Sequence, residues 1–177
     1  MTDKITINIG RAMITTPVDE AARAYIASLL NGAAPAALAS NERFRIGEPC
    51  LGGIFAGRLI DDQDRAYALI VAPRAKGEFS KVTWSDAAQR CAALDVGGFR
   101  DWVLPNRMEA LAMFQRLHPV VKDSDEAFWT DYVYWTSEQH ASDSGYAWYQ
   151  GFHHGNQNYA YKGNYYRARA VRRSVIE

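Results

Sequence analysis

The 177-residue sequence is poor in cysteine, the residue on which disulfide frameworks, zinc fingers and dithiol redox sites depend. It has two, Cys50 and Cys91, and neither belongs to a Cys-x-x-Cys pair. Zinc-binding and thioredoxin-like chemistry are therefore not expected. Two cysteines allow one disulfide, but most intracellular cysteines are small core residues. We expect two buried thiols.

The chain also lacks net charge, because 20 Lys and Arg residues balance 20 Asp and Glu residues. Without a basic surplus it has no general attraction for nucleic-acid phosphates or anionic membranes, so neither is an expected partner. No segment is apolar over a membrane-spanning length, and the first residues do not form a signal peptide. We expect synthesis in the cytoplasm, and release to a virion tail or the extracellular surface by a route such as lysis.

Aromatic residues, in contrast, are plentiful: they make up 12% of the chain, with 10 Tyr and 5 Trp. Since 48% of the residues are hydrophobic and 23% are charged, the composition is that of a globular protein with a sizeable core. Tyr and Trp fill such cores, but they also provide rigid, amphipathic contacts at binding surfaces. Both roles are open to them here.

Residues 1–40 predict a strand followed by a helix. Isoleucines alternate with polar residues over 5–9, which is the period of a half-buried strand. Thr16 is a candidate N-cap and Pro17 suits the first helical position, after which apolar residues fall on one face until Gly32. We interpret this part as an attachment or oligomerisation segment.

The main domain is expected to cover residues 41–177 and to begin with a hairpin. The segments 51–60 and 65–72 have strand-like patterns, and the Asp-rich segment 61–64 separates them. Asp-rich loops can bind calcium, but this one lacks the glycine and the distal glutamate of an EF-hand loop. We expect a solvated turn.

Two helices follow, each marked by a capping signal. Thr83, with an acid three residues later, begins a helix that we expect to end at the glycines 97–98. Asn106 and Glu109 begin the next one, and Pro119 should stop it. Short aromatic-rich strands fill the rest of the chain. The predicted fold class is therefore α+β, with two helices packed on short antiparallel strands and an N-terminal strand and helix extension.

Six motifs follow one another through this domain. They are Val82-Thr83-Trp84-Ser85-Asp86-Ala87-Ala88, Gly97-Gly98-Phe99-Arg100-Asp101-Trp102-Val103-Leu104-Pro105, Glu109, Tyr134-Trp135-Thr136-Ser137, Ala147-Trp148-Tyr149-Gln150-Gly151-Phe152 and Arg169-Ala170-Val171-Arg172-Arg173. Their order resembles the Legionella collagen-like protein C-terminal domain family (domain of unknown function 1566) over residues 82–173. Members of that family have W-x-x-A, G-G-(Y/F)-x-D-W-R-L-P, Y-W-(S/T)-S, A-W and V-R-x-V-R. Val103 departs from the pattern, because the family commonly has Arg there.

The resemblance implies a C-type-lectin-like fold, shared with formylglycine-generating enzymes and with the variable proteins of diversity-generating retroelements. The residues themselves fit a scaffold role for most of the motifs. Large indole rings with a fixed N–H partner can hold short strands together, which is the packing role expected of Trp84, Trp102, Trp135 and Trp148.

The segment 145–167 has a different composition, rich in Tyr, Asn and Gly as protein-binding loops are. Strand alternation predicts Tyr146, Trp148 and Gln150 on one face and Tyr149 on the other. In retroelement variable proteins this region carries the varied positions. The candidate ligand-binding residues are Tyr146, Trp148, Gln150, His153, His154, Asn156, Asn158, Tyr159, Tyr161, Lys162, Asn164, Tyr165 and Tyr166. The alternative is that these residues only form exposed turns.

Catalysis has little support in the sequence. No cysteine follows Cys91, so the reactive thiols of formylglycine-generating enzymes have no counterpart. His153 and His154 are adjacent, and in a strand they would point to opposite faces and could not chelate one metal. Ser137 lies outside a Gly-x-Ser-x-Gly elbow. We expect no catalytic residue, no metal site and no cofactor.

Calcium is the one cofactor alternative, through Asp123, Asp125 and Glu126, but the Glu-Pro-Asn triplet of sugar-binding lectins is missing. Two hypotheses remain. The first is a non-enzymatic module that binds a host-surface protein or glycan, as part of a phage tail fibre or baseplate and as a homo-oligomer or with virion tail proteins. The second is a structural or assembly protein that uses the fold as a scaffold and has no free ligand.

Overall fold

The computed structural model describes residues 4–9, 12–17 and 44–176. Contacts within the chain divide it into two compact units, residues 1–36 and 37–177. The structure does not test whether the first unit serves attachment or oligomerisation, so this role stays a prediction.

The first unit contains a β-hairpin. Strand β1 (Lys4–Ile9) pairs antiparallel with β2 (Ala12–Pro17), which confirms the predicted strand at 5–9. The predicted helix start is wrong, because Thr16 and Pro17 pair with Ile5 and Lys4 as strand residues. Proline is tolerated at such an end position, where its missing N–H leaves no ladder bond broken. The rest of the predicted helix lies outside the described residues.

The second unit begins with a four-stranded antiparallel sheet in the order β11-β5-β4-β3. Its strands are β3 (Pro49–Cys50), β4 (Gly53–Ile60), β5 (Ala66–Val71) and β11 (Val171–Val175). The predicted hairpin between β4 and β5 is confirmed. In its loop the Asp61 carboxylate accepts the backbone N–H groups of Gln63 (2.9 Å) and Arg65 (3.0 Å), which makes it a hydrogen-bonded turn.

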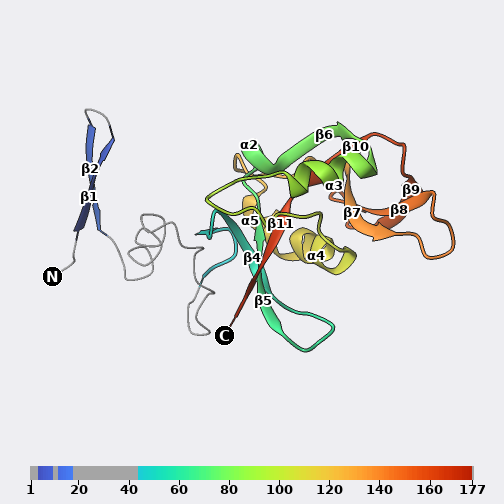
Figure 1. Ribbon diagram of the computed structural model, residues 1–177, viewed down its shortest axis with the longest axis horizontal. Coiled ribbons are helices and arrows are strands. Elements are labelled where there is room, and N and C mark those ends of the chain that lie inside the picture. Colours follow the sequence, from blue (N-terminus) through green and yellow to red (C-terminus); the bar gives the residue numbers. More distant parts are fainter. Residues whose placement is uncertain (1–3, 10–11, 18–43, 177) are drawn as a thin grey trace. The chain divides into compact units, whose positions relative to one another are not determined.

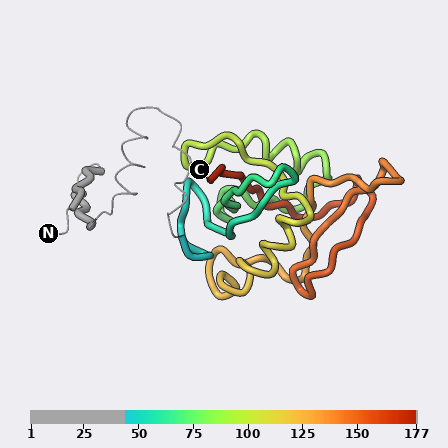
Figure 2. Tube along the Cα trace, turned by 90° about the horizontal axis from the view of Figure 1, so that it is seen from below, coloured from blue at the N-terminus to red at the C-terminus, as the bar shows by residue number. Residues whose placement is uncertain are grey.

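A five-stranded sheet follows in the order β6-β10-β7-β8-β9, with β10 parallel to β7 and the other pairs antiparallel. Its strands are β6 (Glu78–Val82), β7 (Val133–Gln139), β8 (Tyr146–Gly151), β9 (Gln157–Tyr161) and β10 (Tyr166–Arg169). Only Ala170 separates β10 from β11, so the end of the chain belongs to both sheets. Figure 1 and Figure 2 show this last segment, in red, running through the middle of the unit.

The helices of this unit are short. They are α2 (Arg74–Gly77), α3 (Trp84–Ala92), α4 (Arg107–Ala112), the π-helix η1 (Met113–Leu117) and α5 (His118–Val121). Both capping signals are confirmed: the Thr83 hydroxyl accepts the N–H of Asp86, and Asn106 and Glu109 form a reciprocal capping box. Because the unit consists mostly of strands and has few helices, it belongs to the predicted α+β class.

Both predicted helix ends differ from the structure. The first helix stops at Ala92, and residues 96–99 then form a tight turn in which Gly97 and Gly98 have φ values of +66° and +81°. A Cβ at Gly97 would lie 2.3 Å from the Cα of Gly52, so the turn packs against the first sheet. Pro119 does not stop the second helix: it lies in the first turn of α5, where its missing N–H costs nothing.

The core lies between the first sheet, the face of β7 that carries Tyr134, and the η1–α5 helices. Its members include Ile54, Leu69, Val71, Met113, Leu117, Val121, Phe128, Tyr134 and Phe152. Phe128 and Phe152 stack at its centre with ring centroids 4.1 Å apart.

The four tryptophans predicted to pack inside divide into two pairs. Trp102 and Trp135 are 1% and 0% exposed and donate their indole N–H groups to the carbonyls of Phe99 and Val82. Trp84 is half-buried and donates to Thr136 at 2.8 Å. Trp148 is also half-buried, but it belongs to a surface cluster, so the prediction of a core position is wrong for it. Strand alternation could not show which face the helices leave open.

Cys50 and Cys91 are buried thiols, as expected. Desolvation raises the pKa of Cys91 to about 12, which keeps it protonated and unreactive at neutral pH.

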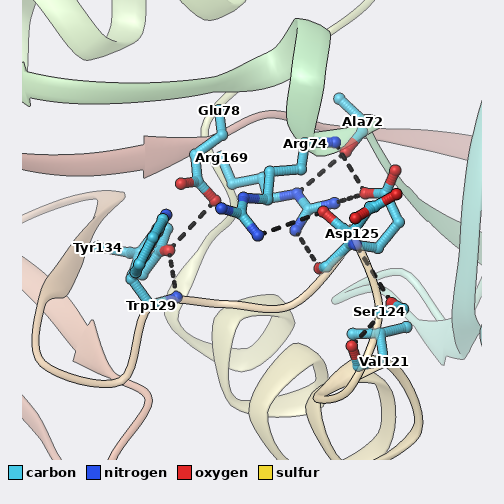
Figure 3. A network of polar contacts seen from close by, with 10 residues as sticks. Ala72, Arg74, Glu78, Val121, Ser124, Asp125, Trp129, Tyr134 and Arg169 are labelled. Atoms are coloured by element: carbon cyan, nitrogen blue, oxygen red, sulfur yellow. Dashed lines mark hydrogen bonds and ion pairs between the residues drawn. The ribbon is translucent and has the colours of Figure 1, made fainter.

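The buried guanidinium of Arg169 joins both sheets to the loop before β7. Its side chain is fully buried and donates to the backbone carbonyls of Ala72 (3.0 Å) and Glu126 (2.7 Å). It also pairs with the Glu126 carboxylate, which accepts the N–H of Arg74 at 2.8 Å. Figure 3 shows Arg169 lying among Ala72, Arg74 and Tyr134. Burial lowers the pKa of Arg169 and Glu126 opposes the shift, so the charge is retained.

The neighbouring arginines tie β11 to two other motifs. Arg172 forms a bidentate pair with Asp101 at 2.8 and 3.0 Å. Arg173 forms another with the fully buried Glu109, at 2.6 and 2.8 Å, and Glu109 also accepts the hydroxyl of Tyr67 at 3.0 Å. The order of the sequence motifs therefore reflects ion pairs that hold the last strand against the loop and helix before it.

His118 should make the stability of the protein depend on pH. Its ring lies about 6 Å from those of Phe114, Phe128 and Phe152, and no described residue bonds its buried Nδ1. Desolvation, aided by Lys122, lowers the pKa of His118 below its ordinary value of 6.5. The unfolded chain then binds a proton at higher pH than the folded one, so stability is lost as pH falls through about 6.5.

We expect the urea concentration at the unfolding midpoint to decrease when the pH is lowered from about 7.5 to about 5.5. The decrease should be smaller in His118→Phe. His153→Gln is the control, because this histidine is exposed. Equal pH dependence in His118→Phe and the unmodified protein would contradict the assignment.

Candidate ligand-binding surface

The open part of the second sheet lies on its last hairpin, β8–β9, which extends beyond α4 (Figure 1). Residues directly opposite each other on antiparallel strands point to the same face. Three such pairs share one face: Tyr146–Tyr161, Trp148–Tyr159 and Gln150–Gln157. At the α4 end of this face Gln150 is fully buried, whereas Tyr159 and Tyr161 at the far end are 46% and 58% exposed. The predicted alternation in β8 is confirmed.

Five rings form a continuous cluster, which we call the aromatic face: Tyr146, Trp148, Tyr159, Tyr161 and His140. The ring centroid of Tyr159 lies 4.2 Å from that of His140, 5.4 Å from Trp148 and 6.0 Å from Tyr146. Tyr146 extends the cluster to Tyr161 at 6.2 Å. The tyrosine and tryptophan rings meet at 71° to 80°, the edge-to-face arrangement that stabilises aromatic pairs.

Arg107, the first residue of α4, closes the inner end of the aromatic face. Its guanidinium carbon lies 3.7 Å from the centroid of the Trp148 ring, a cation–π contact. Its Nε donates to Gln157 at 3.1 Å, and its backbone N–H donates to Glu138 at 2.8 Å. Gln157 donates back to the carbonyl of Arg107 at 2.7 Å. The Trp148 ring is therefore held in place by the helix.

The phenol hydroxyls of the aromatic face differ from those of the core. The Tyr67 hydroxyl bonds Glu109, and the Tyr134 hydroxyl bonds Glu78. Desolvation is the main cause that raises the pKa of both tyrosines, and the neighbouring carboxylates add to it. The pKa of Tyr67 is raised to about 12. No group among the described residues bonds the hydroxyls of Tyr146, Tyr159 and Tyr161. These three hydroxyls remain available as donors and acceptors to a ligand.

Two predicted site residues use their side chains for hydrogen bonds within the hairpin. The Gln150 amide donates to the carbonyl of Gly151 at 2.7 Å and accepts from Gln157 at 3.0 Å. The Asn158 side chain is exposed, but its oxygen accepts the backbone N–H of Tyr159 at 2.8 Å. That contact satisfies a backbone donor on the edge strand β9, which would otherwise invite strand pairing.

Lys162 and Tyr166 are engaged with the scaffold as well. The Lys162 ammonium lies 4.2 Å from the centroid of the Trp84 ring and donates to Gln139 at 2.6 Å. The Tyr166 ring packs on the buried Trp135 with centroids 4.7 Å apart. Both residues support the sheet where α3 packs on it.

The remaining predicted residues lie in two turns. Asn164 and Tyr165 form the turn between β9 and β10, where Tyr165 is 69% exposed. In the loop between β8 and β9, His153, His154 and Asn156 are all exposed.

The expectation that the two histidines point apart is wrong, since their ring centroids are 3.9 Å apart. They lie in a bend after β8, where strand alternation does not apply.

Two residues of this surface were not predicted from the sequence. Arg107 lies about 40 residues before the hairpin and looks like an ordinary helix-start residue, so no local pattern signals its contact with Trp148. His140 lies just after β7, which pairs with β8, and it is not among the binding residues predicted from the sequence. Such contacts depend on strand pairing, which a single sequence does not state.

The described part of the chain contains no cluster of three or more His, Cys, Asp or Glu side chains that could hold a metal ion. Glu126, one of the three acids considered for calcium, faces Arg169 instead. Among the described residues no helix is both long and apolar enough to cross a membrane.

The fold and this surface define a class: a small α+β domain that presents an open aromatic sheet face. Comparison with protein families then matches residues 63–172 to the Lcl C-terminal domain. The chain belongs to this family, which confirms the resemblance seen in the motifs and extends it back to β5. The family indicates a surface or adhesion-type domain. No curated protein matches the chain.

Proposed function

We propose that this protein is a non-enzymatic ligand-binding module with a C-type-lectin-like fold, which recognises a host-surface protein or glycan. The observation that carries the proposal is the aromatic face, where Tyr159 and Tyr161 lie exposed at the end of the sheet. Soluble domains usually bury or scatter such rings, and clustered exposed ones favour a binding site.

The pairing of the last strand, β11, with β5 supports the proposed fold, because it returns the chain end to the start of the domain. The aromatic face offers stacking surfaces and neutral hydroxyls but no nucleophile paired with a base, so binding suits it better than catalysis. Display on a phage tail or another particle, as an oligomer held by the N-terminal unit, completes the proposal.

The experiment compares binding of fluorescently labelled protein to bacterial and host-cell surfaces. Tyr159→Ala/Tyr161→Ala removes two exposed rings and should weaken binding by about tenfold or more, as loss of interface aromatics does. Tyr132→Ala is the matched control, since this tyrosine is 53% exposed at the opposite end of β7. Its binding should equal that of the unmodified protein.

Undiminished binding by the double variant would reject the aromatic face as the binding site. No binding by any of the three proteins would favour the alternative, a structural or assembly role without a free ligand.

A further inference from the structure

The charges around the aromatic face are already engaged within the protein. Arg107 stacks on Trp148 and donates to Gln157, and Glu138 accepts the Arg107 backbone N–H. Lys162, the nearest other cation along the hairpin, is held by the Trp84 ring and Gln139. An incoming sulfate, phosphate or carboxylate would have to break these contacts to find a cation.

The exposed turn that borders the face is acidic. Between β7 and β8, Asp143 is exposed, and its carboxylate accepts the N–H of Gly145 at 2.9 Å. Glu138 is half-buried beside Arg107. Near the rings the carboxylates of Glu138 and Asp143 balance the charges of Arg107 and Lys162, which gives an anionic ligand no net electrostatic advantage.

What the face does offer is suited to hydroxyl-rich, uncharged molecules. The rings of Tyr159 and Trp148 meet at 75° and those of Tyr146 and Tyr159 at 80°, so a flat ring lies beside the edge of the next. The C–H side of a sugar can stack on one ring while the free phenol of its neighbour bonds a sugar hydroxyl. A ligand with only apolar groups would leave these hydroxyls unsatisfied.

We propose that the aromatic face takes an uncharged saccharide, held by Tyr146, Tyr159 and Tyr161 and backed by Trp148. This assignment rests on the proposed function and names its ligand class. Recognition depends on stacking and neutral hydrogen bonds, so affinity should change little with ionic strength, whereas binding of a polyanion would weaken steeply with added salt.

The test is isothermal titration calorimetry of the full chain with a fixed panel of probes. Neutral oligomers of glucose (α- and β-linked), xylose, mannose and N-acetylglucosamine form one arm, and heparin and polygalacturonate oligomers form the other. We expect a neutral probe to bind with an affinity that differs less than about twofold between low and physiological salt.

Three variants locate the binding. Tyr159→Ala should weaken it by about tenfold. Tyr159→Phe keeps the ring and loses the hydroxyl, so it should weaken binding by an intermediate factor, about threefold. Tyr132→Ala should bind as the unmodified protein does.

Each other result overturns the inference. Salt-sensitive binding of only the anionic probes, lost in Tyr159→Ala, would reject an uncharged ligand but keep the proposed binding function. Face-dependent binding to cells without binding of any neutral probe would do the same and favour a protein ligand. Failure of both the cell-binding and the calorimetric experiments would reject the proposed function itself.

Discussion

Glu126→Gln should lower the free energy of unfolding by about 3 kcal/mol, because it leaves the guanidinium of Arg169 buried without its counter-charge. The Arg169 side chain is 0% exposed and Glu126 is 29% exposed, so water can compensate only from one side. Two backbone carbonyl bonds to Arg169 remain, which is why we expect the lower end of the usual range for a broken buried pair.

Urea denaturation followed by circular dichroism measures this loss. Asp123→Asn is the matched control, because this acid is exposed in the same loop, and its effect should stay below about 0.5 kcal/mol. The double variant Glu126→Gln/Arg169→Met removes the buried charge together with its partner and should recover much of the stability. A double variant less stable than Glu126→Gln would show that Arg169 stabilises the fold mainly through its carbonyl contacts.

Trp135→Ala should cost about 4 kcal/mol, the largest loss that we expect from a single substitution in this protein. The ring is fully buried, packs against Tyr166 and donates its indole N–H to Val82 at 3.1 Å. Its removal leaves a cavity between β6, β7 and β10 and a carbonyl without its partner.

The same denaturation measurement checks this result. Trp135→Phe retains most of the ring and should lose about 2 kcal/mol, so the effect stays measurable if Trp135→Ala does not fold. Trp129→Ala is the control: this ring is 43% exposed and contacts Arg74 at 4.6 Å, so its loss should cost no more than about 1 kcal/mol. Equal losses at Trp135 and Trp129 would contradict the assignment of Trp135 to the core.

The starts of α3 and α4 and the β4–β5 hairpin were predictable because their signals are local, whereas the helix start predicted at Thr16 was wrong. A cap such as Asn106 satisfies backbone donors within its own first turn, so its residue type indicates the helix start. The helix ends were not predictable. The π-helix η1 continues α4 into α5, whose first turn contains Pro119, and Gly97 packs on Gly52 from another part of the chain.

The candidate surface shows the same division. Its segment was predictable from composition, and strand alternation placed Tyr146 and Trp148 together on one face. Alternation assigns two faces but not which of them a helix covers. Gln150 therefore entered the predicted site although it is buried, and Arg107 was missed although its guanidinium carbon lies 3.7 Å from the Trp148 ring centroid.

The sequence by itself determined the family, the α+β class and the segment that carries the exposed tyrosines, because motif order, caps and composition are properties of neighbouring residues. The tertiary structure alone decided which rings are exposed and which charges are engaged. Those properties depend on where α4 ends on the sheet and on which arginine meets which carboxylate, contacts that join residues far apart in the chain.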